Sequence, residues 1–108
     1  MNKILLIIHP ELGELSIKEI TDTLTLEDMQ AAVGGYIEPC APQELRDMGY
    51  EMLANEEGLL KGLPPNQNLY PFFFVGNLAF VKVVGEDFEP LTYEDGVKIC
   101  EWVEGLHE

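Results

Sequence analysis

Basic residues are scarce in this sequence. Six lysines and arginines stand against 20 aspartates and glutamates, which gives a formal net charge of −14 over 108 residues. Residues 1–54 and 55–108 each carry ten acidic and three basic side chains, so the charge is spread over the whole chain. Such a field repels nucleic-acid phosphates and anionic lipids, and direct nucleic-acid binding usually needs clustered Lys and Arg. We therefore expect neither nucleic-acid nor membrane binding. The charge favours a host protein with a basic surface as partner, or it only keeps the protein soluble.

Cysteine and histidine are equally scarce. The chain contains Cys40, Cys100, His9 and His107, none of them in the paired spacing of structural zinc sites. Two cysteines are too few for the disulfide scaffold of a small secreted protein, although they could pair if the fold brings them together. A reactive thiol is not expected, because Cys100 lies in an apolar helical stripe and acidic neighbours would raise the pKa of Cys40. The sequence thus predicts no metal, no cofactor and no catalytic residue.

Long apolar runs are also missing. The apolar run at residues 4–8 is shorter than the core of a signal peptide. No segment approaches the roughly 18 apolar residues of a transmembrane helix. A cytoplasmic protein is therefore expected. The chain length suits one domain, so residues 1–108 are predicted to form a single acidic α+β domain.

Hydrophobic periodicity predicts about five strands. Residues 3–8 form a continuous apolar run, which is typical of a central strand covered on both faces. Residues 16–20 alternate more weakly. Residues 50–61 are predicted to form a hairpin around an Asn-Glu-Glu-Gly turn at residues 55–58, where asparagine starts the turn and glycine supplies a positive φ. Residues 72–84 form the most hydrophobic segment of the chain.

The Gly76-Asn77 step divides residues 72–84 in one of two ways. Gly76 could be a bulge in a single long strand, or the two residues could separate two strands. The bulge is preferred because a two-residue hairpin usually has the order Asn-Gly. A strand of this length, which begins with three consecutive phenylalanines, carries more apolar surface than so short a chain easily hides. A homo-oligomer is therefore expected.

Two capped helices are expected. Thr25 and Thr92 each precede an apolar stripe and have an aspartate three residues later, a weak form of the capping box. Gly34 should end the first helix in a left-handed conformation, with a strand following, and Gly105 should end the second. Residues 43–49 form a helical turn or a loop. The predicted fold class is α+β, with a mainly antiparallel or mixed sheet of about five strands and two helices packed on it.

Two motifs carry a resemblance to a known family. The first is L-x4-M-x3-VGGYIE, formed by Leu24, Met29 and residues 33–38, and the second is NEEG-x3-GLPPN at residues 55–66. With these motifs the chain resembles the domain-of-unknown-function 3846 family over most of residues 20–98. Similar proteins are small and uncharacterised, and are often encoded by phages, plasmids and their bacterial hosts. The resemblance implies an accessory gene and a counter-defence role, but no particular activity.

The same motifs supply candidate binding residues. Polar side chains in turns usually cap the backbone or contact ligands. The asparagines of the second motif could therefore hold the turn at residues 55–58 and the proline-rich loop in shape, or they could rim a pocket together with the first motif. The candidates for such a pocket are Tyr36, Glu38, Asn55, Glu56, Gly62, Asn66 and Asn77.

Two functions from different classes remain. The first is a non-enzymatic accessory protein of mobile-element origin that counters a host defence by binding a host protein through an acidic face. The alternative is a protein that binds or sequesters a small nucleotide-like signal at a subunit interface. Strong salt dependence of complex formation would support the first function, and stabilisation by nucleotides would support the second. No enzymatic function is expected.

Overall fold

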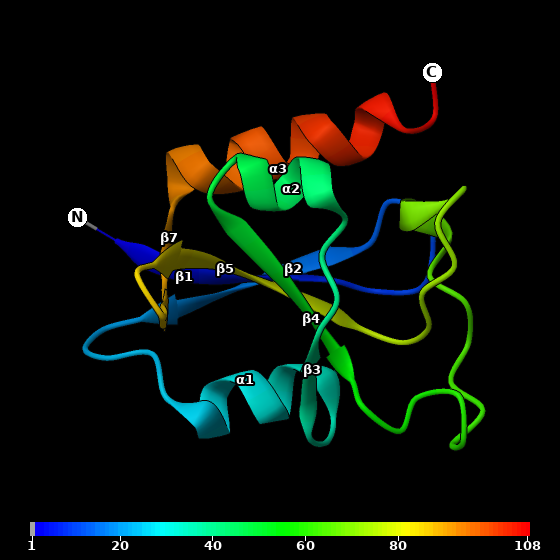
Figure 1. Ribbon diagram of the computed structural model, residues 1–108, viewed down its shortest axis with the longest axis horizontal. Helices are drawn as coiled ribbons and strands as arrows, with labels where there is room; N and C mark the ends of the chain where they lie inside the picture. Colours follow the sequence, from blue (N-terminus) through cyan, green and yellow to red (C-terminus); the bar gives the residue numbers. More distant parts are fainter. Residues whose placement is uncertain (1) are drawn as a thin grey trace.

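The computed structural model describes residues 2–108 and contains an antiparallel sheet with helices on both faces (Figure 1). The strand order is β2-β1-β5-β4-β3, and the short strands β6 and β7 pair with β5 and β1. The predicted α+β class with a mainly antiparallel sheet is confirmed. The strands are β1 (Lys3–Ile8), β2 (Leu15–Ile20), β3 (Ile37–Pro39), β4 (Tyr50–Asn55), β5 (Leu78–Val84), β6 (Asp87–Glu89) and β7 (Leu91–Thr92).

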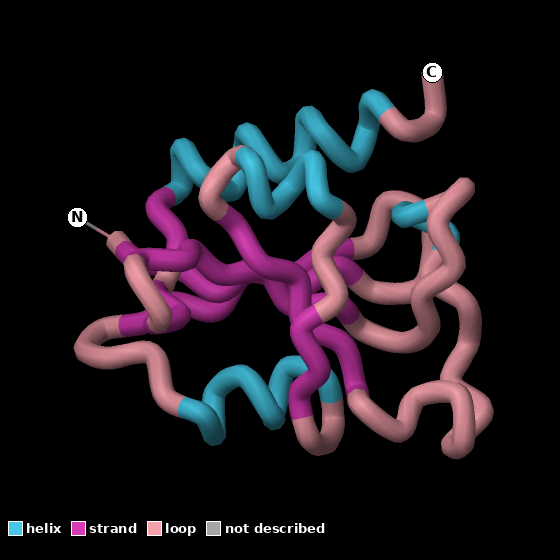
Figure 2. The backbone as a smooth tube through the Cα atoms, viewed as in Figure 1, coloured by secondary structure: helices cyan, strands magenta, loops and turns pink. Residues whose placement is uncertain are grey.

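The helices divide between the two faces of the sheet. α1 (Leu26–Val33) covers one face, and α2 (Gln43–Asp47) and α3 (Tyr93–Gly105) cover the other, as the tube in Figure 2 shows. A single turn of 3-10 helix, η1 (Gln67–Leu69), lies in the long β4–β5 loop, residues 56–77. The predicted helical turn at residues 43–49 is thus a short helix. Within residues 2–108, no helix combines the length and the apolar character needed to cross a membrane.

The N-caps of α1 and α3 are as the sequence predicts, and α3 extends to Gly105 with Leu106, in a right-handed conformation, as its C-cap. At each N-terminus a threonine hydroxyl accepts a hydrogen bond from the backbone N–H three residues on, and the aspartate there accepts one from the threonine N–H in return. α1 ends at Gly34, whose φ of 79° is left-handed. These are local signals, each contributing about 1 kcal/mol, and for that reason the sequence alone reveals them.

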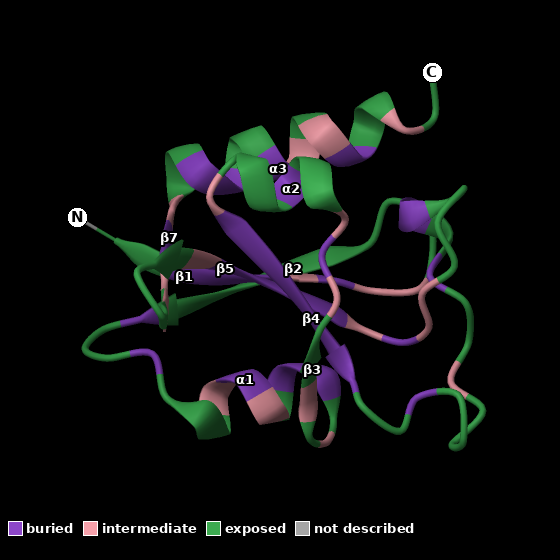
Figure 3. Cartoon of the chain, in the orientation of Figure 1, coloured by how far each residue is buried: buried purple, intermediate pink, exposed green. Residues whose placement is uncertain are grey.

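Each face of the sheet has its own hydrophobic core, because side chains alternate between the faces of a strand. Ile4, Leu6 and Ile8 of β1 join the core under α2 and α3, whereas Leu5 and Ile7 join the core under α1. The prediction of a central strand covered on both faces is confirmed, and Figure 3 shows the buried residues along it. Burial of one such side chain contributes about 1.5–3 kcal/mol, so β1 is the axis of the fold.

Two strand predictions are wrong. Residues 50–61 do not form a hairpin, because β4 ends at Asn55 and the chain continues in turns up to Gly62. Residues 72–84 are not one bulged strand, because β5 begins only at Leu78. Gly76 has a φ of 76°, and a Cβ atom on it would lie 2.8 Å from Leu63 Cδ1. This long-range contact between Gly76 and Leu63 lies just before β5 and cannot be recognised from the hydrophobic pattern.

β5 also removes one argument for self-association. The side chains of residues 78–81 have no exposed surface, because β5 lies between β1 and β4 and is covered on both faces. Residues 78–81 of the most hydrophobic strand are therefore fully used inside one copy of the chain, whereas Val83 and Val84 at its end are exposed. Of the preceding aromatic run, Tyr70 and Phe73 remain exposed, whereas Phe72 packs on Trp102 with its ring centroid 6.3 Å away.

Candidate functional site

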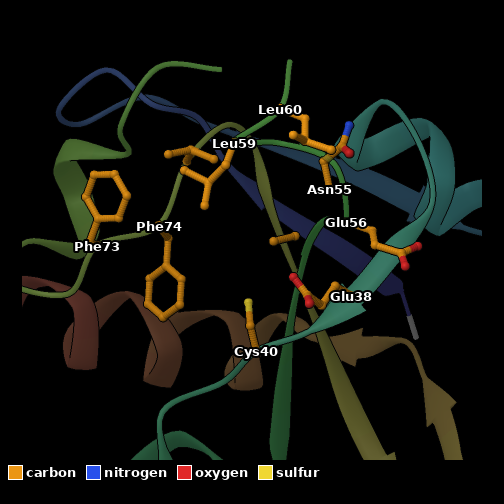
Figure 4. A pocket seen from close by; sticks show the side chains of 10 residues that line it. Glu38, Cys40, Asn55, Glu56, Leu59, Leu60, Phe73 and Phe74 are labelled. Atoms are coloured by element: carbon orange, nitrogen blue, oxygen red, sulfur yellow. The ribbon is translucent and has the colours of Figure 1, made fainter. Parts of the chain in front are cut away.

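A cleft of about 420 Å³ opens between the β3–β4 edge of the sheet and the β4–β5 loop (Figure 4). Its size lies in the range of roughly 300–1,000 Å³ that is typical of ligand sites. The lining is mostly apolar, with carboxylates at the rim. The lining residues are Glu38, Cys40, Ala54, Asn55, Glu56, Leu59, Leu60, Phe73, Phe74 and Val75.

Three large apolar side chains of the cleft are exposed to solvent. Leu59, Leu60 and Phe73 are 72%, 88% and 68% exposed. Gly58 N–H donates to the Asn55 carbonyl at 3.0 Å and closes a turn directly before the two leucines. Grouped exposed apolar side chains are unfavourable in an isolated protein and mark interaction sites. The cleft is therefore a candidate binding site.

The rim of the cleft is negatively charged. Glu38 comes from β3 and Glu56 from the start of the β4–β5 loop, and both are exposed. Among the residues that the structure describes, neither carboxylate forms an ion pair. Burial, followed by the charges of Glu38 and Glu51, raises the pKa of Cys40 to about 12. The Cys40 thiol, which projects toward the cleft in Figure 4, is therefore neutral and acts as an apolar group.

Asn55 lines the cleft, but its side chain serves the fold. Its Nδ2 donates to the Val33 carbonyl at 3.2 Å, and its Oδ1 accepts from Glu57 N–H at 2.8 Å. The residue is buried. Asn55 thus joins the end of α1 to the start of the β4–β5 loop. It holds the wall of the cleft in place.

Asn66 and Asn77 also bind backbone. Asn66 Nδ2 donates to the carbonyls of Ile8 and Gly76, both at 3.0 Å. Asn77 Nδ2 donates to the Ala32 carbonyl at 3.2 Å. Neither side chain lines the cleft, although Asn66 borders a separate cavity next to Phe72 and His107. Asn66 thus fastens the middle of the β4–β5 loop to β1, and Asn77 fastens the end of the loop to α1, which agrees with a loop-holding role.

The other predicted site residues are dispersed. Of the seven candidates, Glu38, Asn55 and Glu56 come together at the cleft. Tyr36 lies directly before β3, is exposed and does not line the cleft. Gly62 lies in a turn with a φ of 67°, and a Cβ atom on it would contact no other atom. Sequence reasoning missed Cys40, Leu59, Leu60 and Phe73. The available signals were two consecutive leucines inside an otherwise polar turn and the three consecutive phenylalanines.

A hydrogen-bonded chain links Ser16, His9 and Asn77. His9 Nε2 lies 2.7 Å from Ser16 Oγ, and His9 Nδ1 lies 3.1 Å from Asn77 Oδ1. Because Asn77 Nδ2 donates to Ala32, its Oδ1 accepts from His9 Nδ1–H, and His9 Nε2 accepts from Ser16. This is the connectivity of a nucleophile, a base and an orienting group. Ser16 is nevertheless exposed on the outer strand, and the cavity that borders His9 does not include it, so we interpret the chain as a clasp of the β1–β2 turn.

The basic residues do not form a phosphate site. Five of the six lysines and arginines pair with a carboxylate each, and no lysine or arginine lines the cleft. Such pairs contribute little stability at a surface, but they disperse the positive charge. Within residues 2–108, no three His, Cys, Asp or Glu side chains are grouped to hold a metal ion. The pairs are Lys18–Asp28, Arg46–Glu51, Lys61–Glu57, Lys82–Asp95 and Lys98–Glu94.

Comparison with known proteins identifies a family. A family model described as a domain of unknown function (DUF3846) matches residues 1–104, almost the whole chain. The comparison with curated proteins found no match, and the comparison with solved structures found none either. Both sequence motifs, at residues 24–38 and 55–66, lie inside the matched range. The hydrogen bond from Asn55 to the Val33 carbonyl joins them in space.

Proposed function

The chain belongs to this family, the domain of unknown function DUF3846, and we propose that it is a non-enzymatic binding protein. Its ligand is a basic, amphipathic segment of a partner protein, which enters the cleft beside β3. The apolar side chains of that segment pack on Leu59, Leu60 and Phe73. Its basic side chains pair with the rim. The observation that carries the proposal is the exposure of these three side chains beside unpaired carboxylates.

Typical interaction energies indicate that the apolar side chains supply the affinity and the carboxylates the selectivity. Burying a leucine or phenylalanine side chain contributes about 1.5–3 kcal/mol, so three of them supply most of the affinity of a weak to moderate complex after the cost of association is met. The exposed carboxylates Glu38 and Glu56 add less energy each. With the net charge of −14, they instead accelerate encounter with a basic partner and select against acidic ones.

The biological context and the class of partner are part of the same proposal. The family resemblance implies a mobile-element accessory gene, and we propose that the partner is a host defence protein met in the cytoplasm. An acidic protein with a preformed apolar cleft could block a basic functional surface of such a partner by occupying it. Nucleotide binding, the alternative function, has less support, because no lysine or arginine lines the cleft and five of six basic side chains already pair with carboxylates.

A peptide titration tests the proposal. Fluorescent peptides built from leucine and lysine, and matched peptides built from leucine and glutamate, are titrated with the protein at low and high salt. We expect the leucine–lysine peptides alone to bind, with an affinity that falls as salt rises. Equal binding of both peptides, or affinity that salt does not change, would contradict the proposal. Thermal stabilisation by a nucleotide instead would favour the alternative function.

Matched variants locate the binding site. Replacing Leu59 and Leu60 by serine removes apolar surface without changing charge, and we expect the peptide affinity to fall by about tenfold or more. The control replaces Val83 and Val84 by serine. These valines are also exposed, but they lie at the opposite end of β5, beyond the pairing of Lys82 with Tyr50. If both double variants weaken binding equally, the cleft is not the site.

A further inference from the structure

The sheet has one long open edge. β2 is the outer strand on the side away from the cleft and pairs only with β1. The opposite edge, β3, has three residues and ends in Pro39, which cannot donate to a further strand. β2 has six residues and contains neither proline nor glycine. An open edge of this length is a template for pairing with another strand.

The register shows which backbone groups of β2 are free to pair. His9 N–H donates to the Glu14 carbonyl at 3.0 Å, which continues the ladder by one pair beyond Ile8 and Leu15. Hydrogen-bonded and non-hydrogen-bonded pairs alternate along an antiparallel ladder. Even-numbered residues of β2 therefore direct their N–H and C=O groups to β1. Leu15, Ile17 and Glu19 direct theirs to the open edge.

Two of these odd-numbered residues, Leu15 and Ile17, border an apolar groove. Leu15 and Ile17 pair with Ile8 and Leu6, whose side chains lie on the α3 face of the sheet. A groove of about 320 Å³ separates them from α3, where Tyr93 and Val97 line the other side. Leu15, Ile17 and Val97 are 46%, 45% and 56% exposed. Open hydrogen-bonding groups and open apolar surface thus coincide along β2.

We propose that a second copy of this chain docks on this edge. β2 pairs antiparallel with β2 of the second copy around a two-fold axis perpendicular to the sheet, so that two sheets become one. This axis leaves both α3 helices on the same face, each beside the groove. A two-fold interface needs a surface that is complementary to itself, and an antiparallel edge strand meets that condition.

The side chains of β2 select one register. With Ser16 on the axis, Leu15 lies opposite Ile17 of the second copy, and Glu14 lies opposite Lys18 of the second copy. The first contact is apolar and occurs on the α3 face. The second adds Glu14 on the α1 face to Lys18, which already pairs with Asp28 of its own chain at 3.0 Å, and the symmetry repeats both. With Ile17 on the axis, Leu15 would face Glu19. With Lys18 on the axis, two lysines would face each other. Opposite charges and apolar pairs across strands are favourable and like charges are not.

Acidic residues at the groove limit the strength of this dimer. Glu101 and Glu104 line the α3 side of the groove and are exposed, and each copy brings its own pair. Repulsion between exposed charges is weak and is screened by salt. The burial of apolar surface is insensitive to moderate salt. The dimer should therefore strengthen as salt rises, whereas a complex at the cleft should weaken.

Solution mass tests the interface. We expect sedimentation equilibrium of the wild-type chain to show a monomer–dimer equilibrium that shifts toward dimer at higher salt. Ile17→Lys places a charge in the proposed apolar contact with Leu15 of the second copy, and this variant should be a monomer. The control, Val84→Lys, adds the same charge at an exposed position on β5 and should dimerise like the wild type. A wild-type chain that stays monomeric at high concentration and high salt, or an Ile17→Lys variant that still dimerises, would overturn the proposal.

A cysteine substitution tests the register. Directly opposite residues in a non-hydrogen-bonded antiparallel pair have Cα atoms about 4.5 Å apart, which a disulfide can bridge. Ser16→Cys should therefore form a covalent dimer under mild oxidation, whereas the wild-type chain and Lys18→Cys should not. A dimer in which Ser16→Cys fails to cross-link, or in which Lys18→Cys cross-links instead, contradicts this pairing. If β2 instead pairs with a basic strand of another protein, Ser16→Cys should form no covalent homodimer. That result would also contradict docking of a second copy.

Discussion

Asn55 and Gly35 lie in such close contact that a Cβ atom on residue 35 would sit 2.9 Å from Asn55 Nδ2. The same nitrogen donates to the carbonyl of Val33, the last residue of α1. The contact joins the Val-Gly-Gly motif to the Asn-Glu-Glu-Gly motif, which are about 20 residues apart in the chain. These motifs therefore build the corner from which the cleft wall projects, and Asn55 and Glu56 of the second motif line the cleft together with neighbouring residues.

We expect Gly35→Ala to lower the free energy of unfolding by about 1–3 kcal/mol, because Asn55 must move and leave a buried carbonyl unpaired. Asn55→Ala should have an effect of similar size. The double variant should cost less than the sum of both, since alanine at 55 leaves room for alanine at 35. Urea unfolding measures all three. The control is Gly105→Ala, where no atom lies near the added methyl group; strict additivity of the two substitutions would contradict this contact.

Asp95 should make stability depend on pH at the acidic end. Burial raises its pKa, but hydrogen bonds from Thr92 N–H at 2.9 Å and from the Tyr50 hydroxyl at 2.7 Å outweigh burial and lower the pKa to about 2. A carboxyl pKa that is lower in the folded state stabilises the protein above the unfolded value, near 4, and this contribution is lost as pH falls toward 2.

The matching measurement compares Asp95→Asn with the wild type. We expect the variant to be less stable by about 2 kcal/mol at pH 6, with the difference shrinking between pH 4 and pH 2. Asp87→Asn, at an exposed position in β6, should show no such trend. A stability difference for Asp95→Asn that is constant down to pH 2 would contradict the lowered pKa.

Both cysteines are free thiols and should react slowly. Burial, with the charges of Glu38 and Glu51, raises the pKa of Cys40 to about 12, and burial with Glu104 raises the pKa of Cys100. Because the thiolate is the reactive form, we expect an aromatic disulfide reagent at pH 8 to react with the native protein at least about tenfold more slowly than with glutathione. In urea both thiols should react at an ordinary rate. Fast reaction of either thiol in the native protein would contradict the raised pKa of that thiol.

The clasp of Ser16, His9 and Asn77 should not be catalytic. We expect no covalent adduct after incubation with a fluorophosphonate, as read from the intact mass, because Ser16 lies outside the cavity that borders His9. His9→Gln keeps the size of the side chain approximately and should cause only a modest loss of stability. An adduct on Ser16 that disappears in His9→Gln would instead establish an activated serine and refute the non-enzymatic proposal.

Much of the fold could be predicted because its signals are local. The capping residues Thr25 and Thr92, the left-handed Gly34 and the continuous apolar run of β1 each act through neighbours within a few residues. The candidate site was less accessible. Asn55 and Asn66 were selected as polar turn residues, but the groups that they bind, such as the Ile8 carbonyl 58 residues away from Asn66, cannot be read from their surroundings in the chain.

The acidic charge, the capped helices and the two-sided central strand follow from the amino-acid sequence, since composition and short-range patterns carry that information. Which apolar residues stay exposed depends on how the chain packs in three dimensions. Leu59 and Leu60 resemble strand residues in the pattern, yet the packing of the β4–β5 loop turns them outward, and Leu78 to Val81 are buried on both faces. The difference arises because burial depends on contacts between distant segments, and the cleft and the open edge of β2 are both products of those contacts.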